Sequence, residues 1–126
     1  MIAADSSVII DYLQGIHSDH TNLLQEALVA WDIVLPPVVV TELFSSPKKA
    51  ERLSFFLNEI EILDINENYW ERAGKSRAVL KSKKIKSKIA DALIAQSCID
   101  HAVPLLTCDE DFRHYAKYCG LALALP

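Results

Sequence analysis

Long apolar runs are missing from this chain of 126 residues. No uncharged apolar stretch approaches the roughly 18 residues that a membrane-spanning helix needs. The segment from Met1 to Leu13 carries acids in place of a basic leader and cleavage site. We therefore expect a soluble, cytoplasmic protein with no membrane contact. The hydrophobic fraction is 51%, and we find no repeat, low-complexity tract or linker, so residues 1–126 should form a single domain.

Cysteine is scarce and does not occur in a paired motif. The chain has three cysteines, an odd number without a C-x-x-C pair, and a reducing compartment would leave them as thiols. A zinc site would need His101 and His114, whose spacings from Cys98, Cys108 and Cys119 match no finger or ribbon pattern. We expect the three cysteines to be small packing residues.

Basic residues are too few to make the chain cationic, since 13 basic residues stand against 17 acidic ones. They are concentrated, however: 8 of them lie in residues 71–88, where Glu71 is the only acid. This basic segment has a formal charge of +7, and the rest of the chain has −11. Such polarity favours a phosphate-tracking strip beside an acidic site. The alternative is a solvated helix face that continues into a lysine-rich loop.

Short apolar segments alternate with helical periodicity along the chain. Strands are expected at residues 2–4, 33–35, 59–63 and 104–106. Helices are expected through Leu13, at 20–31 with Trp31 on the inner stripe, at 38–44, from Ser46 or Pro47 through Leu57, from a cap at Asn66 through Val79, at 89–99 and at 112–115. This alternation predicts an α/β fold in which helices flank both faces of a central parallel β-sheet, a three-layer α/β/α arrangement.

Four acidic residues stand where apolar segments end or helices begin. Asp5 follows the first strand, Asp109 follows the last, Asp91 interrupts the apolar helix at 89–99, and Glu42 lies on the helix at 38–44. Parallel sheets form their sites outside the carboxyl ends of the strands. Carboxylates are costly to desolvate unless they are paired or bind a metal, so the four predict a polyanionic centre for Mg²⁺ or Mn²⁺.

Each acid taken alone has another explanation. Asp5 and Asp109 could cap the helices that follow them, and Glu42 could be a surface residue. Asp91 is harder to explain in this way, because a carboxylate in an otherwise apolar helix needs a partner. The remaining candidates, Asp11, Asp19 and Asp100, are expected to be solvated.

The segments around the four acids resemble the PIN domain family, and within it the VapC-like toxin ribonucleases. The resemblance lies in the order and spacing of four motifs, which are Ala4–Asp11 (ADSSVIID), Val38–Leu43 (VVVTEL), Ile89–Ala95 (IADALIA) and Leu105–Phe112 (LLTCDEDF). The length is also typical of a single-domain toxin. A lysine-rich segment before Asp91 and a cysteine at position 108 depart from the family pattern, but neither change removes an acid.

The resemblance implies a metal-dependent endoribonuclease that hydrolyses RNA phosphodiester bonds. The metal-binding quartet that it implies is Asp5, Glu42, Asp91 and Asp109. On chemical grounds we expect the three aspartates to be direct or water-mediated ligands, and Glu42 either to bind a second ion or to orient the attacking water. Supporting roles follow for Ser7 and Thr107, whereas Asp111 either supports the site or is merely exposed.

The resemblance also implies a homodimer and a small cognate antitoxin. We expect the basic segment to guide the RNA backbone, with Lys83, Lys84 and Lys86 as the contacts. Two other readings stay open: an inactive PIN-like module that binds RNA or protein, and a DNA or structure-specific nuclease of the same fold. A receiver domain is disfavoured because it needs an acidic pair after the first strand and a lysine after the last. A haloacid-dehalogenase-like phosphatase is disfavoured because Ser7 stands where it needs a second aspartate.

Overall fold

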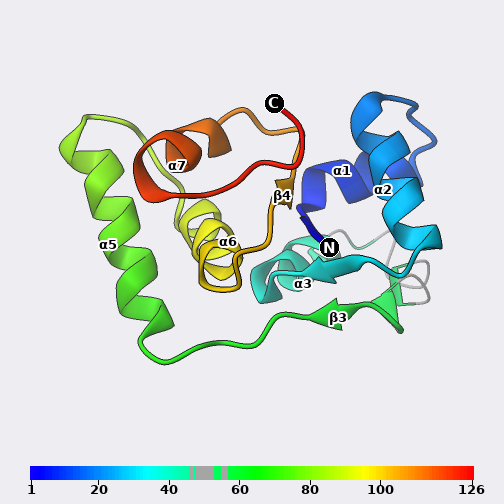
Figure 1. Cartoon of the computed structure of the whole chain (residues 1–126), viewed down its shortest axis with the longest axis horizontal. Helices are drawn as coiled ribbons and strands as arrows, with labels where there is room; N and C mark the ends of the chain where they lie inside the picture. The colour runs from blue at the N-terminus through cyan, green and yellow to red at the C-terminus, as the bar shows by residue number, and fades with distance from the viewer. Residues whose placement is uncertain (46, 48–52, 55–56) are drawn as a thin grey trace.

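A four-stranded parallel sheet forms the centre of the protein, as Figure 1 shows for our computed structural model, which describes residues 1–45, 47, 53–54 and 57–126. The strands, in the order β3-β2-β1-β4, are β1 (Ile2–Ala4), β2 (Ile33–Leu35), β3 (Glu61–Ile62) and β4 (Leu105–Leu106). The helices are α1 (Ser6–Leu13), α2 (Asp19–Val29), α3 (Pro37–Phe44), α5 (Tyr69–Ser82), α6 (Ile89–Asp100) and α7 (Phe112–Cys119). The predicted α/β/α architecture is confirmed.

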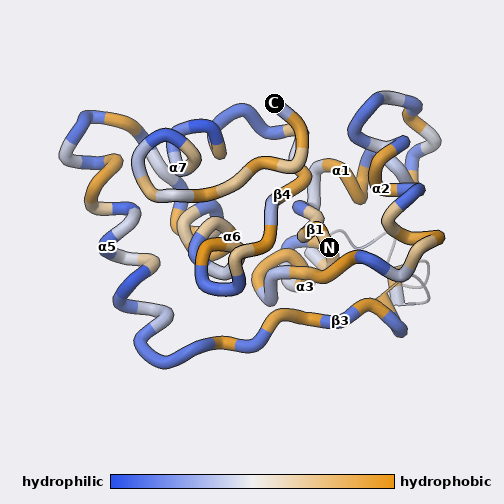
Figure 2. The backbone as a smooth tube through the Cα atoms, viewed as in Figure 1, coloured by the Kyte–Doolittle hydropathy of each residue, from blue (hydrophilic) through white to orange (hydrophobic). Residues whose placement is uncertain are grey.

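Strand β1 lies in the middle of the sheet. Ala3 on β1 pairs in parallel with Val34 on β2 and with Leu105 on β4. Ala3 and Ala4 are fully buried, and so are all residues of β2 and β4. Figure 2 shows this apolar centre, with hydrophilic residues along α7 and much of α5. Burial on both faces explains why these strands are apolar without alternation.

The edges of the sheet differ from the prediction. Strand β3 covers only Glu61–Ile62 instead of residues 59–63, and both of its residues are exposed, as befits an edge strand. At the opposite edge, the C-terminal segment pairs beside β4: the Leu105 N–H donates to the Ala122 carbonyl and the Ala124 N–H donates to the Leu105 carbonyl, each at 2.9 Å. The sequence had not indicated this pairing.

Three helices end at a left-handed residue that is not glycine. After α2, α5 and α6 these residues are Trp31 (φ 53°), Lys84 (φ 61°) and Ala102 (φ 51°). At each end two backbone N–H groups turn back to the helix; after α5, Lys84 donates to Lys81 and Ile85 donates to Leu80, both at 3.0 Å. This is the Schellman arrangement, in which the left-handed position usually holds glycine. With only 3 glycines in the chain, these helix ends carry no sequence signal.

Two predicted helix boundaries are therefore wrong. Trp31 does not lie on the inner stripe of α2: the left-handed turn reverses the chain there, and its side chain is 66% exposed. Asn66 does not cap α5. The cap residue is Asn68 in a left-handed conformation, while the Asn66 carbonyl accepts a hydrogen bond from the Tyr69 N–H at 3.1 Å. The helix predicted from Ser46 or Pro47 through Leu57 lies largely outside the described residues.

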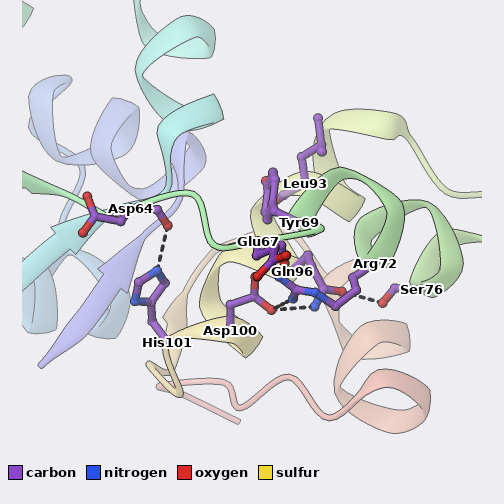
Figure 3. Close-up of polar contacts among 9 residues, drawn as sticks. All are labelled: Asp64, Glu67, Tyr69, Arg72, Ser76, Leu93, Gln96, Asp100 and His101. Atoms are coloured by element: carbon purple, nitrogen blue, oxygen red, sulfur yellow. Dashed lines mark hydrogen bonds and ion pairs between the residues drawn. The ribbon is translucent and has the colours of Figure 1, made fainter.

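A polar seam joins α5 to α6, and it corrects the expectation that Asp100 is solvated (Figure 3). The Asp100 side chain is only 6% exposed and forms an ion pair with Arg72. Gln96 bridges the two helices, since its Nε2 donates to Asp100 at 2.9 Å and its Oε1 accepts from Ser76 at 2.7 Å. A buried carboxylate is tolerated only with such partners. The charge of Arg72 is therefore used to hold α5 and α6 together and is not available to a ligand of the basic segment.

The three cysteines are free thiols in different surroundings. Cys98 is buried in the core and Cys119 is partly buried, whereas Cys108 is exposed, so the packing role predicted for all three is wrong for Cys108. Burial raises the pKa of Cys98 to about 12. Within the described ranges, none of the helices has the length and apolar character needed to cross a bilayer.

The left-handed helix ends yield a stability prediction. Ala102 lies at a position (φ 51°) where its Cβ costs about 1–2 kcal/mol, and the greater chain entropy of glycine offsets about 0.4–1 kcal/mol of that gain, so Ala102→Gly should raise the free energy of unfolding by roughly 0.5–1 kcal/mol. Urea unfolding at constant m-value would measure this. Ala116→Gly, inside α7, is the control and should lower stability. A loss of stability in Ala102→Gly would contradict the assignment of this helix end.

Candidate metal centre

Four separate segments bring acidic side chains to the carboxyl ends of β1 and β4. Asp5 directly follows β1, and Asp109 follows β4 after two intervening residues. Asp91 lies in the first turn of α6 and Glu42 lies on α3, and these two helices pack against each other. Because β1 and β4 are neighbouring parallel strands, their carboxyl ends meet at one edge of the sheet.

Asp5 is held by hydroxyl groups from both strand ends. Its Oδ2 accepts hydrogen bonds from Ser7 Oγ at 2.9 Å and from Thr107 Oγ1 at 2.8 Å. Each hydroxyl in turn accepts a backbone N–H: Ser7 from Cys108 and Thr107 from Asp109, both at 3.0 Å. Asp5 is 4% exposed and makes no side-chain cap to α1, so the capping explanation for this residue is wrong. Ser7 and Thr107 instead fix the orientation of one carboxylate oxygen.

Asp109 combines a local structural role with its place in the cluster. Its Oδ1 accepts the backbone N–H of Asp111 at 2.9 Å, just before α7 begins. One carboxylate oxygen from each of Asp91, Asp109 and Asp111 lies within 4.8 Å of the other two. Asp111, which the sequence left undecided, thus joins the cluster although it is exposed.

The carboxylates influence one another electrostatically. Burial raises the pKa of Asp91 to about 6, with further upward contributions from Asp109, Asp5 and Glu42, and Lys88 opposes the shift. The pKa of Glu42 is also raised, first by burial and then by Asp5 and Asp109, although hydrogen bonding and Lys88 pull it down. All four predicted acids therefore belong to one cluster of like charges.

Hard oxygen ligands in such a cluster fit Mg²⁺ or Mn²⁺. Asp91 and Glu42 have no cationic side chain within salt-bridge distance among the described residues. Their pKa values are raised first by burial and then by neighbouring carboxylates, so a bound cation would offset both effects. Asp91, Asp109 and Asp111 are spaced to share one ion. Asp5 and Glu42 lie close enough to raise the pKa of Asp91, but they are not among the three residues spaced to share one ion.

Two residues of the site escaped the sequence reasoning. Ser6 Oγ donates to Glu42 Oε1 at 3.0 Å and so links α1 to α3. Lys88 is the cap residue of α6, and its charge lowers the pKa values of Asp91 and Glu42. Their only sequence signal was adjacency, since Ser6 follows Asp5 and Lys88 precedes Asp91 by three positions.

The three lysines predicted to contact a polynucleotide have different surroundings. The Lys83 ammonium lies over the Tyr118 ring, 4.6 Å from its centroid. Lys84 and Lys86 instead line an open pocket between α5 and α6.

Comparisons with known proteins agree on the fold. A family model described as PIN domain matches residues 2–118. Among solved structures, VapBC2 from Rickettsia felis bound to a promoter DNA fragment is similar at a TM-score of 0.76 and 21% identity, covering 98% of this chain and 97% of that one. VapBC-5 from Mycobacterium tuberculosis (TM-score 0.72, 21% identity, 97% and 95% covered) and FitAcB from Neisseria gonorrhoeae (0.72, 22%, 98% and 96%) are also similar. No curated protein sequence matches.

The raised pKa of Asp91 makes a prediction for the metal-free protein. A carboxyl group with a folded-state pKa of about 6 and an ordinary value of 3.8 contributes stability below about pH 4 and loses it as the pH rises through 6. Asp91→Asn should therefore raise the stability of the metal-free protein at pH 7 by on the order of 1–2 kcal/mol, and the gain should vanish near pH 4. Thermal unfolding in EDTA across this pH range measures it.

Metal ions and a control variant complete the test. Mg²⁺ or Mn²⁺ should raise the unfolding temperature of the wild-type protein more than that of Asp91→Asn, because the variant lacks one negative ligand. Asp64→Asn, an exposed acid outside the cluster, should behave like the wild type. Equal metal responses in wild type and Asp91→Asn, with no pH-dependent gain, would show that Asp91 is not part of a charged cluster.

Proposed function

The chain belongs to the PIN domain family, and from this premise we propose that it is an Mg²⁺- or Mn²⁺-dependent endoribonuclease. The observation that carries the proposal is the convergence of Asp5, Glu42, Asp91 and Asp109 from four segments onto one end of the sheet. A cluster of like charges at the end of a sheet is costly to keep without a function that uses it.

In this proposal the aspartates hold the ion and Glu42 acts on water. Asp5, Asp91 and Asp109 are the ligands, with Asp111 near enough to contribute. When bound, a divalent ion supplies positive charge where negative charge develops on the phosphoryl oxygens. Glu42, fixed by Ser6 Oγ at 3.0 Å, orients the water that attacks phosphorus. Its raised pKa makes it a better proton acceptor than an ordinary glutamate.

The hydroxyls of Ser7 and Thr107 have a positioning role. By donating to the same oxygen of Asp5, they occupy that oxygen and leave the other one as the ligand. Lys88 adds a positive charge beside the acids, where it can contact a phosphate oxygen without neutralising any carboxylate fully.

We further propose that the chain is the toxin of a toxin–antitoxin pair. Support comes from the similar solved structures, of which the Mycobacterium tuberculosis protein is described as a member of the VapBC family of toxin–antitoxin systems. An antitoxin bound over the acidic edge would need complementary cations, because that edge carries the excess negative charge.

A homodimer is part of the same proposal, and we assign it to an apolar groove between α5 and α6. The groove has a volume of about 530 Å³, and Trp70, Gly74, Ile89 and Leu93 are among its lining residues. Trp70 is 57% exposed and Ile89 is 63% exposed. Leaving two large apolar side chains of one groove in contact with water is unfavourable, and such patches are typical of interfaces. Ile89 and Asp91 both lie in the first turn of α6, so a second copy docked here would approach the same end of that helix as the acidic site.

The first experiment is cleavage of a mixed cellular RNA pool by the purified protein with Mg²⁺ or Mn²⁺. We expect metal-dependent cutting that EDTA abolishes and that Asp5→Ala lowers at least about 100-fold. Asp64→Ala is the charge-matched control and should cut like the wild type. Single-stranded and duplex DNA are tested in parallel.

The outcomes separate the alternatives. Cutting of DNA alone would replace the ribonuclease with a DNA nuclease of the same fold. No cutting of any polymer by a folded protein that binds Mn²⁺ poorly would favour the inactive binding module. Cutting that persists in Asp5→Ala would remove the acidic cluster from the mechanism.

The dimer proposal predicts that Trp70→Ser weakens self-association. A buried tryptophan at an interface contributes about 2 kcal/mol or more, so the dimer dissociation constant should rise roughly 30-fold. Sedimentation equilibrium would measure it. Trp31→Ser is the matched control, because Trp31 is 66% exposed on a different part of the surface. An unchanged dissociation constant in Trp70→Ser would place the interface elsewhere.

A further inference from the structure

An open pocket lined by cations lies at the turn between α5 and α6. Its volume is about 340 Å³, and its lining residues are Arg77, Lys81, Lys84, Ile85, Lys86 and Ser87. Four of these six are cationic and none is acidic. Within the described residues, none of the four forms an ion pair with a carboxylate. Arg77 and Lys81 also line the apolar groove assigned to the homodimer, so Lys84 and Lys86 are the cations of this pocket that the proposed dimer leaves available.

The backbone preforms this pocket. The turn that ends α5 places Lys84 in the left-handed region and returns the Ile85 N–H to the Leu80 carbonyl at 3.0 Å. Across the pocket, Arg77 Nε donates to the Ser87 carbonyl at 2.9 Å, which ties α5 to the segment leading into α6. Arg77 and Lys81 are four residues apart and so project from the same face of the helix. The cations are thus held by helix and turn geometry rather than by a flexible tail.

The pocket is coupled to the acidic cluster through the start of α6. Ser87 lies four residues before Asp91, so their Cα atoms are at most about 14 Å apart. Ser87 Oγ is hydrogen-bonded to the Tyr115 hydroxyl. Burial raises the pKa of Tyr115, and among the smaller contributions the charge of Asp91 raises it while that of Arg77 lowers it. A polynucleotide strand could therefore span the two sites over a few consecutive phosphates.

We infer that this pocket is a phosphate subsite that binds the RNA backbone next to the phosphate being cleaved, with Lys84 and Lys86 as its direct contacts. The inference rests on the proposed ribonuclease function and adds which part of the basic segment contacts RNA. A phosphodiester suits the pocket because it offers negative charge and acceptor oxygens to donors without requiring a base-specific contact. Arg72 and Lys83 do not line this pocket. Arg72 pairs with Asp100, and the Lys83 ammonium lies over the Tyr118 ring.

The left-handed backbone at Lys84 does not by itself mark a binding site, because Trp31 and Ala102 adopt the same conformation. It does supply a useful variant. Lys84→Ala removes the ammonium and keeps the conformational cost of a Cβ, whereas Lys84→Gly removes both. The glycine variant should be more stable than the alanine variant and should bind RNA equally weakly, which separates binding from folding.

The experiment measures binding of a fluorescent, random-sequence, 20-nucleotide single-stranded RNA pool to the full chain in EDTA, over a series of salt concentrations. For the wild type, the logarithm of the association constant should fall linearly with the logarithm of the salt concentration. Lys84→Ala and Lys86→Ala should each flatten that slope by about 0.7 and weaken binding several-fold at low salt. Lys83→Ala, which removes the same charge from the adjacent position, should keep the wild-type slope.

Each outcome bears on the inference separately from the proposed function. Flattened slopes in Lys84→Ala and Lys86→Ala, but not in Lys83→Ala, support the subsite. Equal effects of all three variants would show that only the net charge matters, and this would overturn the subsite. Wild-type slopes in every variant, or no binding of the RNA pool by the wild type, would also overturn it. The ribonuclease proposal stands or falls on metal-dependent cleavage, so cleavage with unchanged slopes would overturn the subsite alone.

Discussion

Repulsion among carboxylates gathered at one edge of a parallel sheet is the constraint on which the rest of this structure depends. The order β3-β2-β1-β4 makes the ends of β1 and β4 neighbours, which brings Asp5 and Asp109 together, while α3 and α6 add Glu42 and Asp91. The pKa of Asp91 rises to about 6 as a result of burial and these charges. The surrounding polar groups can be understood as responses to that concentration of charge.

Those responses differ from one acid to the next. Asp5 is stabilised by Ser7 and Thr107, whose hydroxyls are themselves fixed by backbone N–H groups. Glu42 has the single hydroxyl of Ser6, and its pKa remains raised. Among the described residues, the charge of Lys88 is what opposes the rise that burial causes in the pKa of Asp91. The site thus combines one rigid carboxylate with two whose charge is poorly compensated, which is the condition in which a divalent ion binds most favourably.

Positive charge is divided between structure and surface. Arg72 neutralises a buried aspartate between α5 and α6, and Arg77 ties α5 to the segment before α6. The remaining cations are therefore presented on a scaffold that two of their neighbours hold in place. In sequence the segment looks uniform, with eight basic residues among eighteen. In the structure its residues lie in three environments: the ion pair with Asp100, the ring of Tyr118 and the cationic pocket.

The sequence by itself determined the α/β architecture and pointed to the four acids as candidates, because an apolar strand that ends in a carboxylate and a carboxylate inside an apolar helix are local patterns with few physical explanations. Tertiary structure alone decided that Asp111 joins the cluster, that Ser6 holds Glu42, that Asp100 is buried, and that Lys83 lies over the Tyr118 ring. It also placed the C-terminal segment beside β4 and ended three helices without glycine. Each of these features depends on contacts between residues that are distant in the chain, and local sequence propensities do not specify such contacts.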